Sequence, residues 1–166
     1  LSGAVGGTDV GNIAITNGLV VNSGGAISNA DAVSAGTATI NDTIGANSVA
    51  ITGTSGLGAN VTTSGTQSYG ATTLTGNRVL AGSGVTFTST VGGATGGESL
   101  TVNTGSVEFQ GAVGTAGTAL GDISAATSLT VTAAGSIVNA GNLSAASAAL
   151  SGAVGGTDVG NIAITN

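Results

Sequence analysis

The strongest constraint on this chain is a segment that occurs twice without a change. LSGAVGGTDVGNIAITN fills residues 1–17 and again residues 150–166. Identity over this length indicates internal repetition, and a repeat unit usually buries its apolar face against a neighbouring copy. We therefore expect residues 1–149 to be one tandem repeat unit and residues 150–166 to be the start of the next, in an excerpt from a longer array.

Short segments of alternating apolar and polar residues recur within the unit. Residues 85–88, 107–110 and 129–132 all alternate, and their starts are equally spaced along the chain. Alternation of period two is typical of a strand with one buried face. Glycine-rich clusters between these segments, such as residues 92–97, predict tight corners in which glycine supplies positive φ angles.

Short strands, glycine corners and this recurrence predict an all-β fold, a parallel β-solenoid with coils of roughly 20–25 residues. Each coil would pair with the one before it and turn its apolar positions inward. A β-sandwich repeat is the alternative, because sandwiches also use short alternating strands. The residues expected to face inward are Val49, Ile51, Val85, Phe87, Leu100, Val102, Val107, Phe109, Leu129, Val131, Ile162 and Ile164.

The composition closes several function classes. There is no Cys or His, and a single Lys or Arg stands against seven acids, for a formal net charge of −6. Thiol and imidazole catalysis are therefore excluded, and so is a basic nucleic-acid interface. No apolar run approaches the roughly 18 residues of a membrane span. We expect no enzyme activity, no catalytic residues, no cofactor, no nucleic-acid partner and no membrane-spanning segment.

Four stretches carry a resemblance to a known group of proteins: residues 60–69, 73–77, 84–91 and 98–105. Their Thr/Ser/Gly-rich strand pattern resembles the filamentous-haemagglutinin-like and related β-strand-repeat adhesins, giant surface proteins of Gram-negative bacteria. The resemblance implies a secreted, right-handed parallel β-helix that serves as a fibre or adhesive stalk.

These observations predict a structural repeat unit of an extracellular bacterial filament, stalk or sheath with an adhesive surface. Its expected partners are tandem copies of itself, with a polysaccharide or host surface as a further candidate. A carbohydrate-binding or carbohydrate-processing β-helix is the alternative function. Ice binding comes third, suggested by Thr-x-Thr pairs at residues 37/39, 52/54, 73/75, 86/88 and 130/132.

Few side chains are candidates for a site. Tyr69 is spaced to stack in the interior with Phe87 and Phe109, and its alternative role is a glycan contact. Asp9 and its repeat copy Asp158 lie in oxygen-rich turns and are the weak candidates for a calcium site, the one metal considered.

Two further acids and the single arginine are assigned to the surface. Glu98 and Glu108 are expected to be solvated, because neither has a recognisable catalytic partner. Arg78 lies about one coil before Glu98, so that an exposed ion pair between them is expected.

Overall fold

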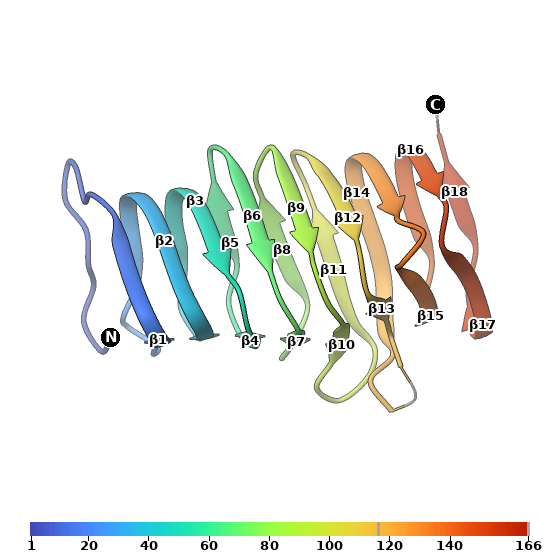
Figure 1. Cartoon of the computed structure of the whole chain (residues 1–166), viewed down its shortest axis with the longest axis horizontal. Coiled ribbons are helices and arrows are strands. Elements are labelled where there is room, and N and C mark those ends of the chain that lie inside the picture. Colours follow the sequence, from blue (N-terminus) through green and yellow to red (C-terminus); the bar gives the residue numbers. More distant parts are fainter. Residues whose placement is uncertain (116, 166) are drawn as a thin grey trace.

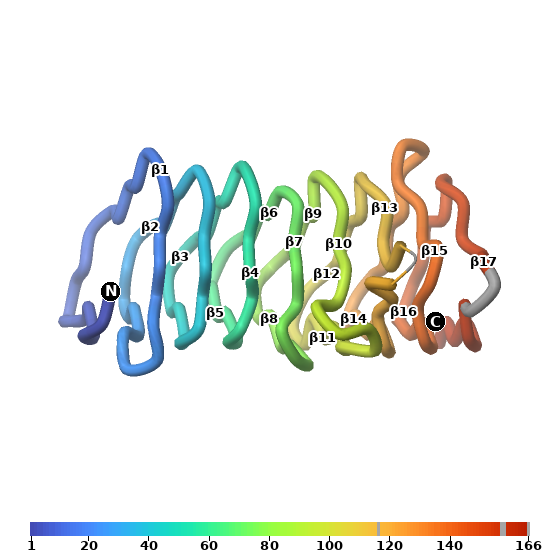
Figure 2. Tube along the Cα trace, turned by 90° about the horizontal axis from the view of Figure 1, so that it is seen from below, coloured from blue at the N-terminus to red at the C-terminus, as the bar shows by residue number. Residues whose placement is uncertain are grey.

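The computed structural model describes residues 1–115 and 117–165, with every side chain in these ranges except those of Thr157 and Asp158. The described chain contains strands and no helix, and about eight coils stack along one axis (Figures 1 and 2). Every strand pairing is parallel. Parallel pairing between successive coils confirms the predicted β-solenoid and excludes a sandwich, whose sheets are antiparallel.

The strands are short except where one bends around a corner of the coil. They are β1 (Ile13–Val21), β2 (Ile27–Ile40), β3 (Ile44–Ile51), β4 (Ser55–Leu57), β5 (Val61–Thr63), β6 (Thr66–Tyr69), β7 (Thr72–Leu74), β8 (Arg78–Ala81), β9 (Gly84–Phe87), β10 (Val91–Gly93), β11 (Glu98–Val102), β12 (Ser106–Phe109), β13 (Ala112–Val113), β14 (Leu120–Val131), β15 (Ser136–Ala140), β16 (Leu143–Leu150), β17 (Ala153–Val159) and β18 (Ile162–Ile164).

Each full coil contributes one strand segment to each of three stacked faces, which the chain visits in the order C, A, B. Face A consists of residues 13–15, 33–35, 49–51, 67–69, 85–87, 107–109, 129–131 and 148–150. Face B consists of residues 19–21, 38–40, 55–57, 72–74, 91–93, 112–113, 136–140 and 153–159. Face C consists of residues 27–30, 44–46, 61–63, 78–81, 98–102, 120–125, 143–145 and 162–164.

Coil length varies along the rod. On face A, Val33 pairs with Val49 in a short coil, whereas Val85 pairs with Val107 in a longer one. The longer coils are the ones that carry the loops after β10 and β13, which extend from the same side of the rod (Figure 1). The regular recurrence in the sequence at positions 85, 107 and 129 therefore belongs to these longer coils, and several other coils are shorter than predicted.

The interior is a set of apolar columns, because parallel pairing in register places equivalent inward positions above one another. Most of the residues predicted to face inward are buried: Val49, Ile51, Val85, Phe87, Leu100, Val102, Val107, Phe109, Leu129 and Val131. Ile162 and Ile164 also occupy inward positions, as predicted, but they are 48 % and 39 % exposed. They continue inward columns of face C, but they lie in the last described coil, where nothing covers them.

The three aromatic side chains stack in one column of face A. The ring centroids of Tyr69 and Phe87 are 5.6 Å apart, and those of Phe87 and Phe109 are 5.5 Å apart. All three side chains are fully buried. Their stack therefore fills the middle of the solenoid, as their spacing in the sequence predicted.

Many corners need glycine for a reason other than positive φ. A β-carbon added at Gly70 would lie 2.2 Å from the carbonyl oxygen of Gly53, the corner residue of the preceding coil. Neither residue has a positive φ, whereas Gly24, Gly96 and Gly97 do. The expectation of positive φ is therefore correct for some corners only, and at others glycine allows two coils to approach closely.

Candidate functional site

Tyr69 is a core residue. Its hydroxyl donates a hydrogen bond of 2.9 Å to Oε1 of Gln67, whose Nε2 donates one of 2.7 Å to the carbonyl of Ala81. Burial raises the pKa of the Tyr69 hydroxyl well above its ordinary value. Because the side chain is 0 % exposed, its ring has no face open to a sugar, which contradicts the alternative role of Tyr69 as a glycan contact.

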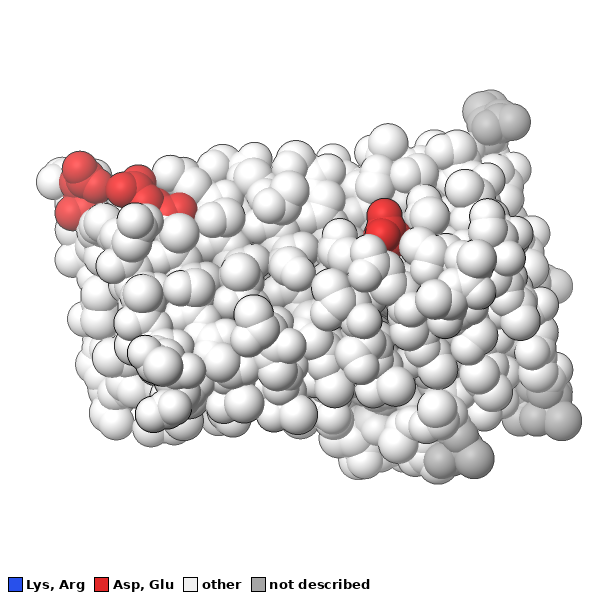
Figure 3. All heavy atoms as spheres, in the orientation of Figure 1, with Lys and Arg blue, Asp and Glu red and all other residues white. Residues whose placement is uncertain are grey.

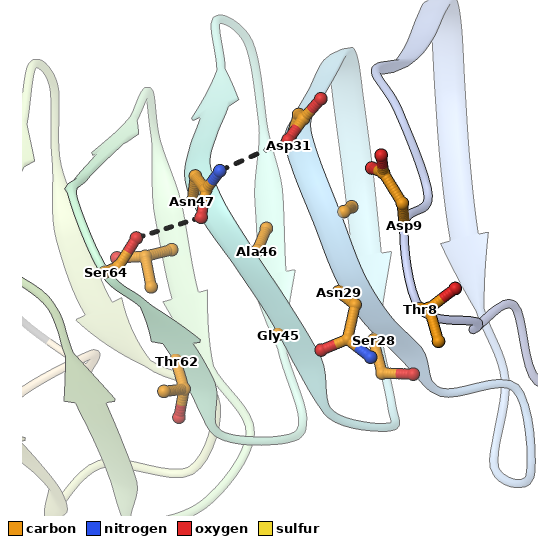
Figure 4. Close-up of a pocket in the computed structure, with 12 residues that line it drawn as sticks. Thr8, Asp9, Ser28, Asn29, Asp31, Gly45, Ala46, Asn47, Thr62 and Ser64 are labelled. Carbon is orange, nitrogen blue, oxygen red and sulfur yellow. Dashed lines mark hydrogen bonds between the residues drawn. The ribbon is translucent and has the colours of Figure 1, made fainter.

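A shallow polar groove runs along face C at the N-terminal end of the rod (Figure 4). Asn47 Nδ2 donates to Oδ1 of Asp31 over 3.3 Å, and Ser64 Oγ donates to Oδ1 of Asn47 over 3.0 Å. Asp9 lies near Asp31 in the groove (Figure 4). Acidic side chains gather at the N-terminal end of the rod on the face shown in Figure 3. These side-chain hydrogen bonds connect three successive coils and therefore stabilise their stacking.

The calcium prediction gains no support from this geometry. Among the side chains that the structure describes, no three His, Cys, Asp or Glu come together as metal ligands. Asp9 lines the groove, but the side chain of Asp158 lies outside the described part of the structure. The backbone of Asp158 pairs with Asn139 on face B, so the two copies of this aspartate lie on different faces.

Glu98 lies beneath the loop that follows β10, and the prediction that it is solvated is wrong. Its side chain is 6 % exposed. Oε1 accepts hydrogen bonds from Thr95 Oγ1 (2.6 Å) and from the backbone N–H of Thr95 (2.8 Å). The hydrogen bond from the Thr95 hydroxyl is the main reason that the pKa of Glu98 lies below its ordinary value. The carboxylate therefore holds the loop in its conformation.

Acidification is expected to destabilise this loop. The pKa of Glu98 is lower in the folded chain than its ordinary 4.5, so the unfolded chain binds more protons below that pH. The stabilisation from Glu98 is complete above its unfolded pKa and is lost as the pH falls through its folded pKa. Thermal unfolding followed by circular dichroism from about pH 6 to pH 3 should show a smaller loss of stability in Glu98→Gln than in the unmodified chain. Equal losses would contradict this role; Asp42, whose pKa is also lowered, contributes to both slopes.

Arg78 connects coils through backbone carbonyls. Nη1 donates a hydrogen bond of 2.6 Å to the carbonyl of Gly58, in the preceding coil, and Nε donates one of 3.0 Å to the carbonyl of Gly76. The carboxylate of Glu98 instead accepts a hydrogen bond from the hydroxyl of Thr95. The expected ion pair between Arg78 and Glu98 is therefore replaced by these two separate contacts.

A ladder of polar side chains, which sequence reasoning missed, runs along the corner that leads into face C. In each step a side-chain oxygen accepts a hydrogen bond from a backbone N–H of the next coil. The steps are Asn60 to Val79 (2.9 Å), Asn77 to Ser99 (2.9 Å), Ser99 to Asp122 (3.2 Å), Asp122 to Asn142 (2.8 Å) and Asn142 to Asn161 (3.1 Å). The sequence signal that could have predicted this ladder is a polar residue one or two positions before an alternating segment.

The Thr-x-Thr pairs do not form one rank. Thr39 and Thr73 point outward on face B with Gly56 between them. Thr86 and Thr130 lie on face A with Glu108 between them. A flat threonine surface, which motivated the ice-binding hypothesis, is therefore interrupted on both faces.

The ends of the rod carry most of its exposed large apolar side chains. In the described part of the chain these are Leu1, Val20, Leu150, Ile162 and Ile164. All except Val20 belong to one of the two copies of the repeated segment. The candidate functional surface is therefore the pair of coil ends.

The fold and this surface define a class: a parallel β-solenoid whose repeated segment forms both end coils. Comparison with known proteins found no matching family model, no matching curated protein and no matching solved structure. Over the described residues there is no helix of the length and hydropathy needed to cross a membrane.

Proposed function

We propose that this chain is a structural repeat unit of an extracellular bacterial filament, stalk or sheath, and that the faces of the rod provide an adhesive surface. The observation that carries the proposal is the repeated segment, which forms the end coil at both ends of a continuous solenoid. A solenoid whose ends share one sequence can be extended by further copies, because each coil needs only its two neighbours.

The bonds between coils suit a load-bearing rod. Backbone pairing joins every coil to the next, and the polar ladder and Arg78 add side-chain bonds in the same direction. Arg78 is also the only residue of the chain after which trypsin could cleave, and its guanidinium is hydrogen-bonded. A scarcity of trypsin sites suits a fibre that is exposed outside the cell, and this supports the extracellular location together with the resemblance to surface adhesins.

Electron microscopy of a chain with three tandem units tests the structural role. We expect continuous thin rods that lengthen by roughly 35–40 Å per unit, since nearly eight coils stack at about 4.8 Å each. Separate globular particles joined like beads would contradict the proposal. Binding of the same rods to an immobilised glycan array tests the adhesive component, and rods that bind no glycan more than an uncoated surface would remove polysaccharide as the partner.

A further inference from the structure

The two copies of the repeated segment lie on different faces of the solenoid. In the first copy, Val5 pairs with Ile27 of face C, and Ile13 lies on face A. In the second copy, the equivalent Val154 pairs on face B, and Ile162 pairs on face C. The second copy is therefore displaced by one face, because the intervening coils do not add up to a whole number of turns.

The two copies also use opposite edges. The second copy pairs with the coil before it, through Leu150 with Val131, Val154 with Ile137, Val159 with Ala140, Ile162 with Leu143 and Ile164 with Ala145. The first copy pairs with the coil after it, through Val5 with Ile27, Val10 with Ala30, Ile13 with Val33 and Ile15 with Ala35. The backbone of Leu1 is hydrogen-bonded beside Val21, since its carbonyl accepts from the N–H of Asn22. One sequence thus has an observed partner on each of its two edges.

We propose that the open C-terminal end is covered by the next copy of this sequence, which stacks on residues 150–164 with the pairing seen at the N-terminal end. The inference rests on the proposed function and specifies the junction within the filament. Each unit then continues the solenoid turned by one face relative to the unit before it.

Burial at the two ends supports this occupant. Ile162, Ile164 and Leu150 are 48 %, 39 % and 41 % exposed at the open end. In the junction they would lie against Val33, Ala35 and Val21 of the next unit. Those three residues face inward and are nearly fully buried in this structure. Each column therefore remains apolar through the junction, and covering these side chains removes their apolar surface from water, which is favourable.

The displacement by one face has a visible consequence. The loops after β10 and β13 extend from one side of the unit (Figure 1). In an array they would extend from a different face in each successive unit and return to the first face in the fourth. Surface features of the unit are thereby distributed around the filament.

A two-unit chain tests the junction: residues 1–166 followed directly by a second copy of residues 18–166. The chain has no natural cysteine, so cysteines can be placed at Ala163 of the first unit and Ser34 of the second. Ala163 is equivalent to Ala14, which pairs with Ser34 in this structure. Both positions face outward, so that the substitutions leave the interior unchanged. We expect a short thiol cross-linker to join the pair, seen as a shift in gel mobility, as fast as it joins Ala14→Cys to Ser34→Cys within one unit.

A second pair of cysteine positions tests the alternative junction, in which the next unit is not displaced by one face. Face C of the next unit would then follow face C, and the register of face C would bring Ala26 of the second unit, rather than Ser34, towards Ala163. Rods of double length with a cross-link at Ser34 support the junction. Rods of double length that cross-link Ala163→Cys to Ala26→Cys, or to neither, overturn the junction and leave the structural role intact. Two separate particles overturn both proposals.

Discussion

Replacement of Phe87 by alanine is expected to lower the free energy of unfolding by about 3–5 kcal/mol. Phe87 is 0 % exposed and lies between Tyr69 and Phe109, so the substitution leaves a cavity and also removes both ring contacts of the stack. Such contacts contribute roughly 0.5–1.5 kcal/mol per pair beyond burial. Denaturant titration followed by circular dichroism measures the change.

Two control variants test whether the loss of stability comes from the lost apolar volume and from the buried position of Phe87. Phe87→Leu keeps most of the apolar volume and should lose clearly less stability than Phe87→Ala. Thr73→Ala changes an exposed outward position and should stay within about 0.5 kcal/mol of the unmodified chain. If Phe87→Ala were as mild as Thr73→Ala, the aromatic column would not be the centre of the core.

Gly70→Ala is expected to be destabilising by an amount near the upper end of the roughly 1–3 kcal/mol seen for overpacked sites. The added β-carbon would lie 2.2 Å from the carbonyl oxygen of Gly53 and 2.7 Å from that of Thr52. Both neighbours are backbone atoms of the preceding coil, so neither can turn away as a side chain would. The corner must shift, which strains the 2.8 Å hydrogen bond from the N–H of Gly70 to the carbonyl of Ile51.

Gly56→Ala provides the same chemical change without the overlap. No atom lies within 4 Å of a β-carbon built at Gly56, and its φ is not positive. We expect this variant to be neutral or stabilised by up to about 1 kcal/mol, because alanine restricts the unfolded chain. Thermal unfolding of the two variants side by side checks the prediction, and equal midpoints would show that the corner at Gly70 accepts a side chain.

Much of the fold could be predicted because a strand in a solenoid has a local signature. The alternation in residues 49–51, 85–87 and 107–109 identifies strands and also tells which side chains face inward. The spacing of Tyr69, Phe87 and Phe109 indicated that equivalent positions stack. The alternation depends only on a few neighbouring residues. The stacking of equivalent positions follows from parallel pairing in register.

The candidate site was less predictable, because it depends on contacts between coils. Glu98 and Glu108 are both acids within strands, yet only the loop folded over Glu98 makes it a buried hydrogen-bond acceptor. The polar ladder joins Asp122 to Asn142, one coil further along the chain. Contacts of this kind appear only when the register of one coil against the next is known.

The sequence by itself determined that this chain consists of short strands with a repeated segment and apolar inward positions, and it favoured a parallel β-solenoid over a sandwich, since strand periodicity and repetition can be read from the sequence. The parallel pairing that excludes the sandwich came from the structure. Only the tertiary structure decided where each copy of that segment lies. The coil that leads from Val33 to its partner Val49 is shorter than the one that leads from Val85 to its partner Val107. These differences add up along the rod, so the lengths of all the preceding corners and loops together determine the face on which residue 150 lies.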